Sequence, residues 1–211
     1  MRIVRRIALV VIVSVLLIVG SVRICSQQLK RTAERVVHVS YELSIRDHAP
    51  TLGDLRQQFG TELKQADPCT ASGCKYEVTL SNRAFARLHL YPYAAISSSF
   101  WVKDDAVQEN VVELWTANHE GRMIGAYVDA KYCKECSGFD VDPCDGPIAS
   151  FASGSVRIGS ASRIEEKRAA FALNPSCLTS FRGCASIADL GPALWRGSAS
   201  GAVQCTAAEQ R

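Results

Sequence analysis

Residues 7–22 read Ile7-Ala-Leu-Val-Val-Ile-Val-Ser-Val-Leu-Leu-Ile-Val-Gly-Ser-Val22 and follow three arginines, Arg2, Arg5 and Arg6. A helix over these 16 uncharged residues is roughly 24 Å long, slightly short of a hydrocarbon core of roughly 30 Å. Local thinning of the bilayer and snorkelling arginines compensate for such a mismatch. We therefore predict a basic cytoplasmic amino terminus at 1–6 and a single transmembrane signal-anchor at 7–23.

A cleaved export signal is the alternative interpretation of this segment. The apolar run exceeds the usual signal-peptide core of about 7–15 residues. Val19-Gly20-Ser21 is an acceptable but poor site for signal peptidase, and Ile24 before Cys25 argues against lipid attachment. An uncleaved anchor is favoured, with secretion after cleavage near Ser21 as the alternative.

Cysteine content decides the predicted orientation, because positive charges flank the span on both sides. Arg23, Lys30, Arg31 and Arg35 nearly balance the three arginines before it, so the positive-inside rule alone gives no answer. Eight of the nine cysteines follow Cys25, which is typical of a chain in an oxidising compartment. We expect a single-pass membrane protein with a cytoplasmic amino terminus and the rest of the chain extracytoplasmic.

The net charge of +3 is concentrated near the anchor. Residues 1–35 hold seven of the 24 Lys/Arg residues and one of the 21 acids, so residues 36–211 carry 17 basic and 20 acidic residues. A mildly acidic domain without a basic stripe lacks the electrostatic signature of nucleic-acid binding. We expect no nucleic-acid partner; the expected partners are the membrane, through Ile7–Val22, and a protein of the envelope or cell surface.

Beyond the anchor, the patterning predicts a helical stalk at 24–36, a disulfide-stapled domain at 37–196 and a flexible Ser/Gly/Ala-rich tail at 197–211. Strict alternation of apolar and polar residues from Val37 to Arg46 predicts the first strand of the domain. Thr51 and Asp54 predict a capped short helix that ends at Gly60.

Further strands are expected from alternation and from short connecting turns. They cover 74–81, 98–102, 107–116, 123–133 and the surroundings of Val156 and Ile158, whereas 83–90 suits helix or strand and 134–150 is a predicted loop. Ser162 and Glu165 predict a capping box for a helix ending at Asn174-Pro175, followed by one or two short helices. The predicted fold class is α+β and mainly antiparallel, with about seven strands, a small sandwich as one arrangement, and short carboxy-terminal helices.

The distal cysteines are disulfide candidates: Cys69, Cys74, Cys133, Cys136, Cys144, Cys177, Cys184 and Cys205. Cys69 with Cys74, and Cys177 with Cys184, are predicted local pairs because each closes a short loop. Zinc binding by the first pair is the alternative. Eight cysteines allow 105 pairings, so these pairs are hypotheses.

Cys133-Lys-Glu-Cys136 is the one segment with a catalytic alternative, since a C-x-x-C pair can serve as a redox dithiol. The segment follows a predicted strand rather than opening a helix, and nearby acids would raise a thiol pKa. Structural bridges are favoured. We find no other catalytic constellation and expect no cofactor or metal. The leading hypothesis is a membrane-anchored extracytoplasmic binding or scaffold domain, not an enzyme; the alternative is a membrane-tethered thiol–disulfide oxidoreductase using Cys133 and Cys136.

Overall fold

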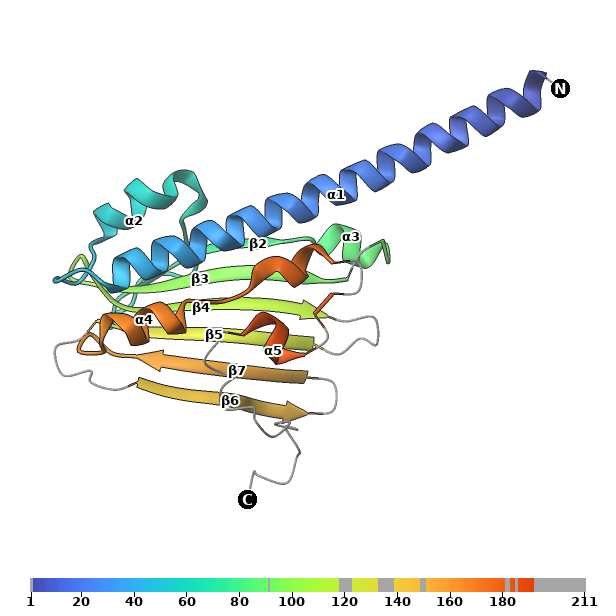
Figure 1. Ribbon diagram of the computed structural model, residues 1–211. Helices are drawn as coiled ribbons and strands as arrows, with labels where there is room; N and C mark the ends of the chain where they lie inside the picture. The colour runs from blue at the N-terminus through green and yellow to red at the C-terminus, as the bar shows by residue number, and fades with distance from the viewer. Residues whose placement is uncertain are drawn as a thin grey trace.

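The computed structural model describes residues 2–90, 92–117, 123–132, 139–148, 151–180, 183–184 and 186–191. It contains one β-sheet with helices packed on one face and a long helix that extends far beyond the sheet (Figure 1). The helices are α1 (Arg2–Ser44), α2 (Leu52–Phe59), η1 (Gly60–Glu62), α3 (Arg83–Arg87), α4 (Ile164–Ala170), η2 (Pro175–Thr179) and α5 (Ile187–Leu190). The strands are β1 (Lys64–Gln65), β2 (Cys74–Ser81), β3 (Ala94–Lys103), β4 (Ala106–Ala117), β5 (Met123–Lys131), β6 (Phe139–Ile148) and β7 (Phe151–Ile158).

The sheet has six long strands and the two-residue strand β1, in the order β1-β2-β3-β4-β5-β7-β6. Strands β2 to β5 form an antiparallel meander, as the short connections predict. The sheet is mixed because β5 and β7 are parallel, with β6 antiparallel to β7 on the outside. The α+β class and the predominance of antiparallel pairing are confirmed, whereas a sandwich is wrong because these strands make one sheet.

Helix α1 forms the second layer of the domain with its carboxy-terminal half. Seven of its ten buried residues form a stripe with alternating spacings of four and three: Val22, Ser26, Leu29, Ala33, Val36, Ser40 and Leu43. Every second member of this stripe is small, which lets the helix axis approach the sheet closely. The remaining members are Val or Leu, of which Leu29, Val36 and Leu43 belong to the hydrophobic core. Residues 24–36, predicted as a stalk, therefore include core residues of the domain.

The predicted strand Val37–Arg46 is wrong, because α1 continues through it to Ser44. Alternation over these residues coincides with a helical stripe that begins at Val22, and no proline interrupts the chain before Pro50. Extending an existing helix by one turn is far less costly than nucleating a new element. The helical stripe buries Val36, Ser40 and Leu43 against the sheet.

Strand β6 and the start of α4 differ from the predictions. Within the predicted loop 134–150, residues Phe139–Ile148 form edge strand β6, whose register shifts beyond Asp142. An edge strand tolerates prolines such as Pro143 and Pro147 because it needs no ladder bonds on its outer side. The capping box of α4 lies one residue later than expected: the Glu166 carboxylate accepts a hydrogen bond from the Arg163 amide at 2.9 Å.

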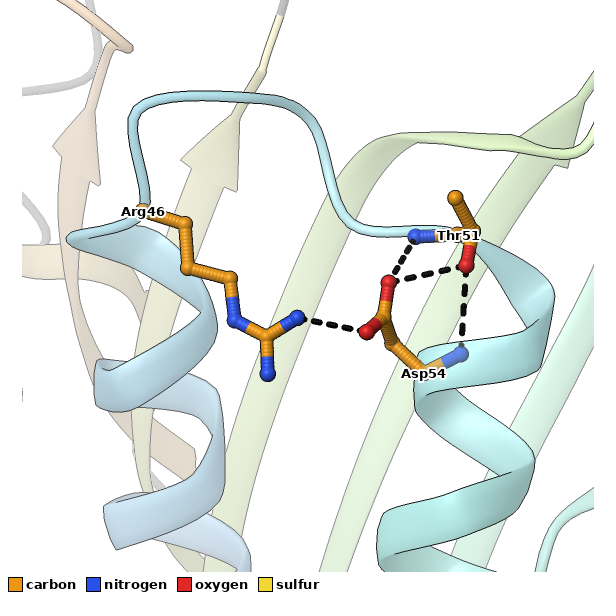
Figure 2. Close-up of polar contacts among 3 residues, drawn as sticks. All are labelled: Arg46, Thr51 and Asp54. Carbon is orange, nitrogen blue, oxygen red and sulfur yellow. Dashed lines mark hydrogen bonds and ion pairs between the residues drawn. The ribbon is translucent and has the colours of Figure 1, made fainter.

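The predicted capping box of α2 is confirmed, and an ion pair links it to the end of α1 (Figure 2). Asp54 accepts hydrogen bonds from the Thr51 amide at 2.8 Å and from the Arg46 guanidinium at 2.6 Å. The Thr51 amide, followed by the Arg46 side chain, lowers the pKa of Asp54 to about 2. This contact fixes the corner between the long helix and α2.

A buried lysine closes the carboxy-terminal end of α1. Lys167 of α4 donates from Nζ to the carbonyl of Ser44 at 2.8 Å and to that of Ser160 at 3.0 Å. An ammonium group at this helix end satisfies an otherwise unpaired carbonyl and complements the helix dipole. Burial lowers the pKa of Lys167. The contact connects α1 to the last third of the chain.

Candidate functional site

Two of the predicted disulfides are present. Cys69 and Cys74 are bonded across a short loop before β2, and Cys177 and Cys184 are bonded between η2 and α5. Cys184 is fully buried in the core, whereas Cys69 lies at the surface. Among the described cysteines, Cys25 is free.

The alternative redox pair, Cys133 and Cys136, lies outside the described residues, as do Cys205 and the tail at 197–211. Cys144 belongs to β6, in a part of that strand whose side chains are not described. The pairing of these four cysteines stays a prediction. Within the described ranges, no three or more His, Cys, Asp or Glu side chains form a group that could hold a metal ion.

A line of polar side chains crosses the interface between α1 and the centre of the sheet. The hydroxyl of Ser40 on α1 lies 3.5 Å from the hydroxyl of Ser98 on β3, which donates to Asn110 Oδ1 on β4 at 2.9 Å. All three residues are fully buried. Such a buried line favours one position of the helix along the sheet, because sliding would leave polar groups unpaired.

The opposite face of the sheet, here called the outer face, carries the best candidate for a binding surface. Helices α1, α4 and α5 all lie on the other side (Figure 1). Strand alternation and register place mainly polar and aromatic residues, with Val111, on the outer face: Lys75, Glu77, Ser97, Ser99, Trp101, Glu109, Val111, Glu113, Trp115, Tyr127, Asp129, Lys131 and Arg157. Most of these side chains are half-buried, whereas their neighbours along β3 and β4 are fully buried in the core.

A cavity of about 300 Å³ lies on the outer face across β2, β3 and β4. Its lining combines an amine, a hydroxyl, an indole and two carboxylates: Lys75, Ser99, Trp101, Glu109, Val111 and Glu113. This volume is at the lower end of the range for small ligands or for one inserted side chain. The cavity therefore offers both apolar contact and hydrogen bonds of either polarity.

The Cys69–Cys74 loop supports one wall of this cavity. The Trp101 indole Nε1 donates to the carbonyl of Ser72 at 3.1 Å. Gly73 adopts φ +135°, and a Cβ at this position would lie 2.6 Å from the carbonyl oxygen of Val102. The loop therefore requires glycine there, and the disulfide closes it beside Trp101.

A second aromatic group flanks the cavity along β4 and β5. Trp115 and Tyr127 pack edge to face with ring centroids 5.0 Å apart. The Trp115 indole covers Gly125, where a Cβ would lie 2.5 Å from the ring, and it donates to Glu113 Oε2 at 3.2 Å. Trp115 therefore holds a carboxylate that lines the cavity.

Asp129 is the most perturbed carboxylate of the outer face. Burial, followed by the nearby charge of Glu109, raises the pKa of Asp129 from 3.8 to about 6, although Lys131 opposes the shift. One carboxylate oxygen of Asp129 is buried and makes no hydrogen bond within the part of the chain that the structure describes. Folding therefore disfavours the ionised form of Asp129 relative to the unfolded chain.

This pKa predicts how stability depends on pH. The folded state binds the proton of Asp129 more tightly than the unfolded state, so the contribution of Asp129 to the free energy of unfolding falls as pH rises from about 4 to about 6. We expect Asp129→Asn to raise the free energy of unfolding at pH 7 by about 1 kcal/mol, a value reduced for partial exposure, and to flatten this pH dependence. Urea denaturation between pH 4 and 8 measures both effects. Asp67→Asn at an exposed position is the control, and a less stable Asp129→Asn protein at pH 7 contradicts the prediction.

No family model, no curated protein and no solved structure matches this chain.

The outer face was not predicted as a binding surface from the sequence. The signal was present in β4, where Glu109, Val111, Glu113 and Trp115 occupy every second position. Alternation shows that these residues share a face, but only the sheet order brings Lys75 and Ser99 beside them.

Proposed function

We propose that this protein is a membrane-anchored extracytoplasmic domain that binds or scaffolds a protein partner. One observation carries the proposal: the same continuous helix has an exposed apolar half and a half that belongs to the core of the domain. Residues Ile7 to Val19 are largely exposed apolar side chains, whereas α1 is buried periodically from Val22 onward. The helix is long and apolar enough to cross a membrane.

Water disfavours such a length of exposed apolar helix, and a bilayer supplies its natural environment. Because no flexible segment separates the two halves of α1, the domain is held close to the membrane in a restricted orientation. The outer face is the proposed binding surface. It presents aromatic side chains with charges of both signs around a cavity, a composition that suits a protein partner.

Site-specific photo-crosslinking in cells tests this proposal. A photoreactive residue in place of Val111, inside the cavity, is expected to form one discrete adduct with a protein partner. The same residue in place of Gln57, exposed on α2, is the control. We expect Ser99→Arg, which fills the cavity, to abolish the Val111 adduct, and Gln57→Arg to leave it intact.

Three results oppose the proposal. If the adducts at Val111 are the same as those at Gln57, the outer face is not the binding surface. Extraction of the full chain from membranes by alkaline carbonate contradicts the transmembrane anchor. Protection of the domain from protease added outside the cell membrane contradicts the extracytoplasmic orientation.

A further inference from the structure

Exposed large apolar side chains outside the first half of α1 are few among the described residues. They are Ile24 of α1 at 61% exposed, just past the apolar run, and, outside α1, Leu88 at 67%, Ile164 at 53% and Leu90 at 38%. Leu88 and Leu90 lie together immediately after α3, in the connection between β2 and β3. We call residues 83–90 the α3 tip.

The α3 tip lies at the end of the sheet from which the apolar half of α1 leaves the domain (Figure 1). Burial of α1 begins at Val22, at the end of the apolar run. If the apolar run spans a bilayer, the membrane surface is therefore close to this end of the domain. Helix α4, which begins at Ile164, lies toward the opposite end of the sheet (Figure 1).

The charge of the α3 tip matches that of an anionic lipid surface. Arg83 and Arg87 are exposed beside Leu88, and residues 82–93 contain no acidic residue. Arginines beside a membrane attract anionic headgroups, and apolar side chains next to them gain free energy by entering the acyl boundary. The tip combines both features on one short segment.

The base of the connection is held in a defined conformation. Asn82 is buried, donates from Nδ2 to the carbonyl of Pro92 at 2.8 Å and accepts from the amide of Ala94 at 2.7 Å. This clamp joins the two ends of the connection, and His89 adopts the left-handed φ of 54°. Leu88 is therefore displayed by a fixed turn.

We propose that the α3 tip is a second membrane contact, in which Leu88 and Leu90 enter the bilayer that α1 spans while Arg83 and Arg87 bind anionic headgroups. This inference rests on the proposed membrane anchoring. Together, the helix and the tip define two contacts that fix the tilt of the domain, and hence the direction in which the outer face points.

Fluorescence quenching by brominated lipids tests the inference on the full chain. The Leu88→Trp and Ile164→Trp proteins are reconstituted into vesicles of phosphatidylcholine and phosphatidylglycerol, with bromine near the headgroup end of the acyl chains. After subtraction of the wild-type signal, we expect the tryptophan at position 88 to be quenched and that at position 164 to be unaffected. Adding Arg83→Ser and Arg87→Ser is expected to reduce quenching at position 88, as is replacing phosphatidylglycerol with phosphatidylcholine.

Flotation of the same vesicles separates the two proposals. Co-flotation without quenching at position 88 overturns the tip contact and leaves the anchor in place. Failure to co-float overturns both. Equal quenching at positions 88 and 164 overturns the tip contact as well, because it shows no preference for this end of the domain. If neither the arginine substitutions nor the loss of phosphatidylglycerol reduces quenching at position 88, Arg83 and Arg87 do not bind anionic headgroups.

Discussion

Replacing Leu29 with alanine is expected to lower the free energy of unfolding of the domain by about 2–5 kcal/mol. Leu29 is 1% exposed and lies in the middle of the buried stripe of α1. Truncation removes apolar contacts and leaves a cavity between the helix and the sheet. Denaturation of the full chain in detergent micelles, followed by tryptophan fluorescence, measures the change.

Leu17→Ala is the matched control for this experiment, because Leu17 occupies the same helix and is 67% exposed to its surroundings. We expect it to leave the stability of the domain within about 0.5 kcal/mol of the wild-type value. Equal effects at the two positions contradict the division of α1 into an anchor half and a core half. A negligible effect of Leu29→Ala shows that residues 24–36 are a stalk, as their position in the sequence predicts.

Removing the Cys177–Cys184 disulfide by a double substitution to alanine is expected to lower the free energy of unfolding by about 2–4 kcal/mol. Part of this loss is the conformational entropy that the unfolded chain regains. The rest comes from the core, because Cys184 is fully buried and belongs to the hydrophobic cluster. Chemical denaturation under non-reducing conditions measures the loss.

The Cys69–Cys74 disulfide provides the comparison, because it closes a loop of similar length, with a sequence separation of five against seven. The chain-entropy contribution is nearly the same for the two bridges. We therefore expect the double alanine variant of Cys69 and Cys74 to lose less stability than that of Cys177 and Cys184. A larger loss at Cys69 and Cys74 shows that the exposed loop contributes more than the buried bridge.

Local sequence patterns predicted an element correctly where the interactions that stabilise it lie within a few residues of each other. Thr51, Asp54 and Gly60 predict the boundaries of α2 because capping involves atoms only three residues apart. Alternation predicts β2 because successive side chains of a strand point to opposite faces of the sheet, one apolar and one polar. Two local cysteine pairs were predicted correctly because short loops keep their thiols close together.

The strand predicted at Val37–Arg46 was wrong, because alternation and a helical stripe fit the same residues. The longer pattern from Val22 to Leu43 was the better guide, since helix propagation makes each residue depend on the preceding turns. The loop predicted over β6 was also wrong, because prolines suit a loop unless the strand that contains them lies at a sheet edge. In both cases the deciding information lay outside the local stretch.

The sequence by itself determined the apolar helix, the meander strands and the short disulfide loops, because each follows from interactions between residues close in the chain. The tertiary structure decided what no local pattern contains. It placed half of the long helix in the core, through Leu29, Ala33 and Val36, and brought Lys75 and Ser99 beside Glu113 on the outer face. It also placed the α3 tip at the end of the sheet from which the apolar half of α1 leaves the domain (Figure 1). The physical reason is that packing and sheet order join residues far apart in the chain, and the free energy of those contacts depends on the whole fold.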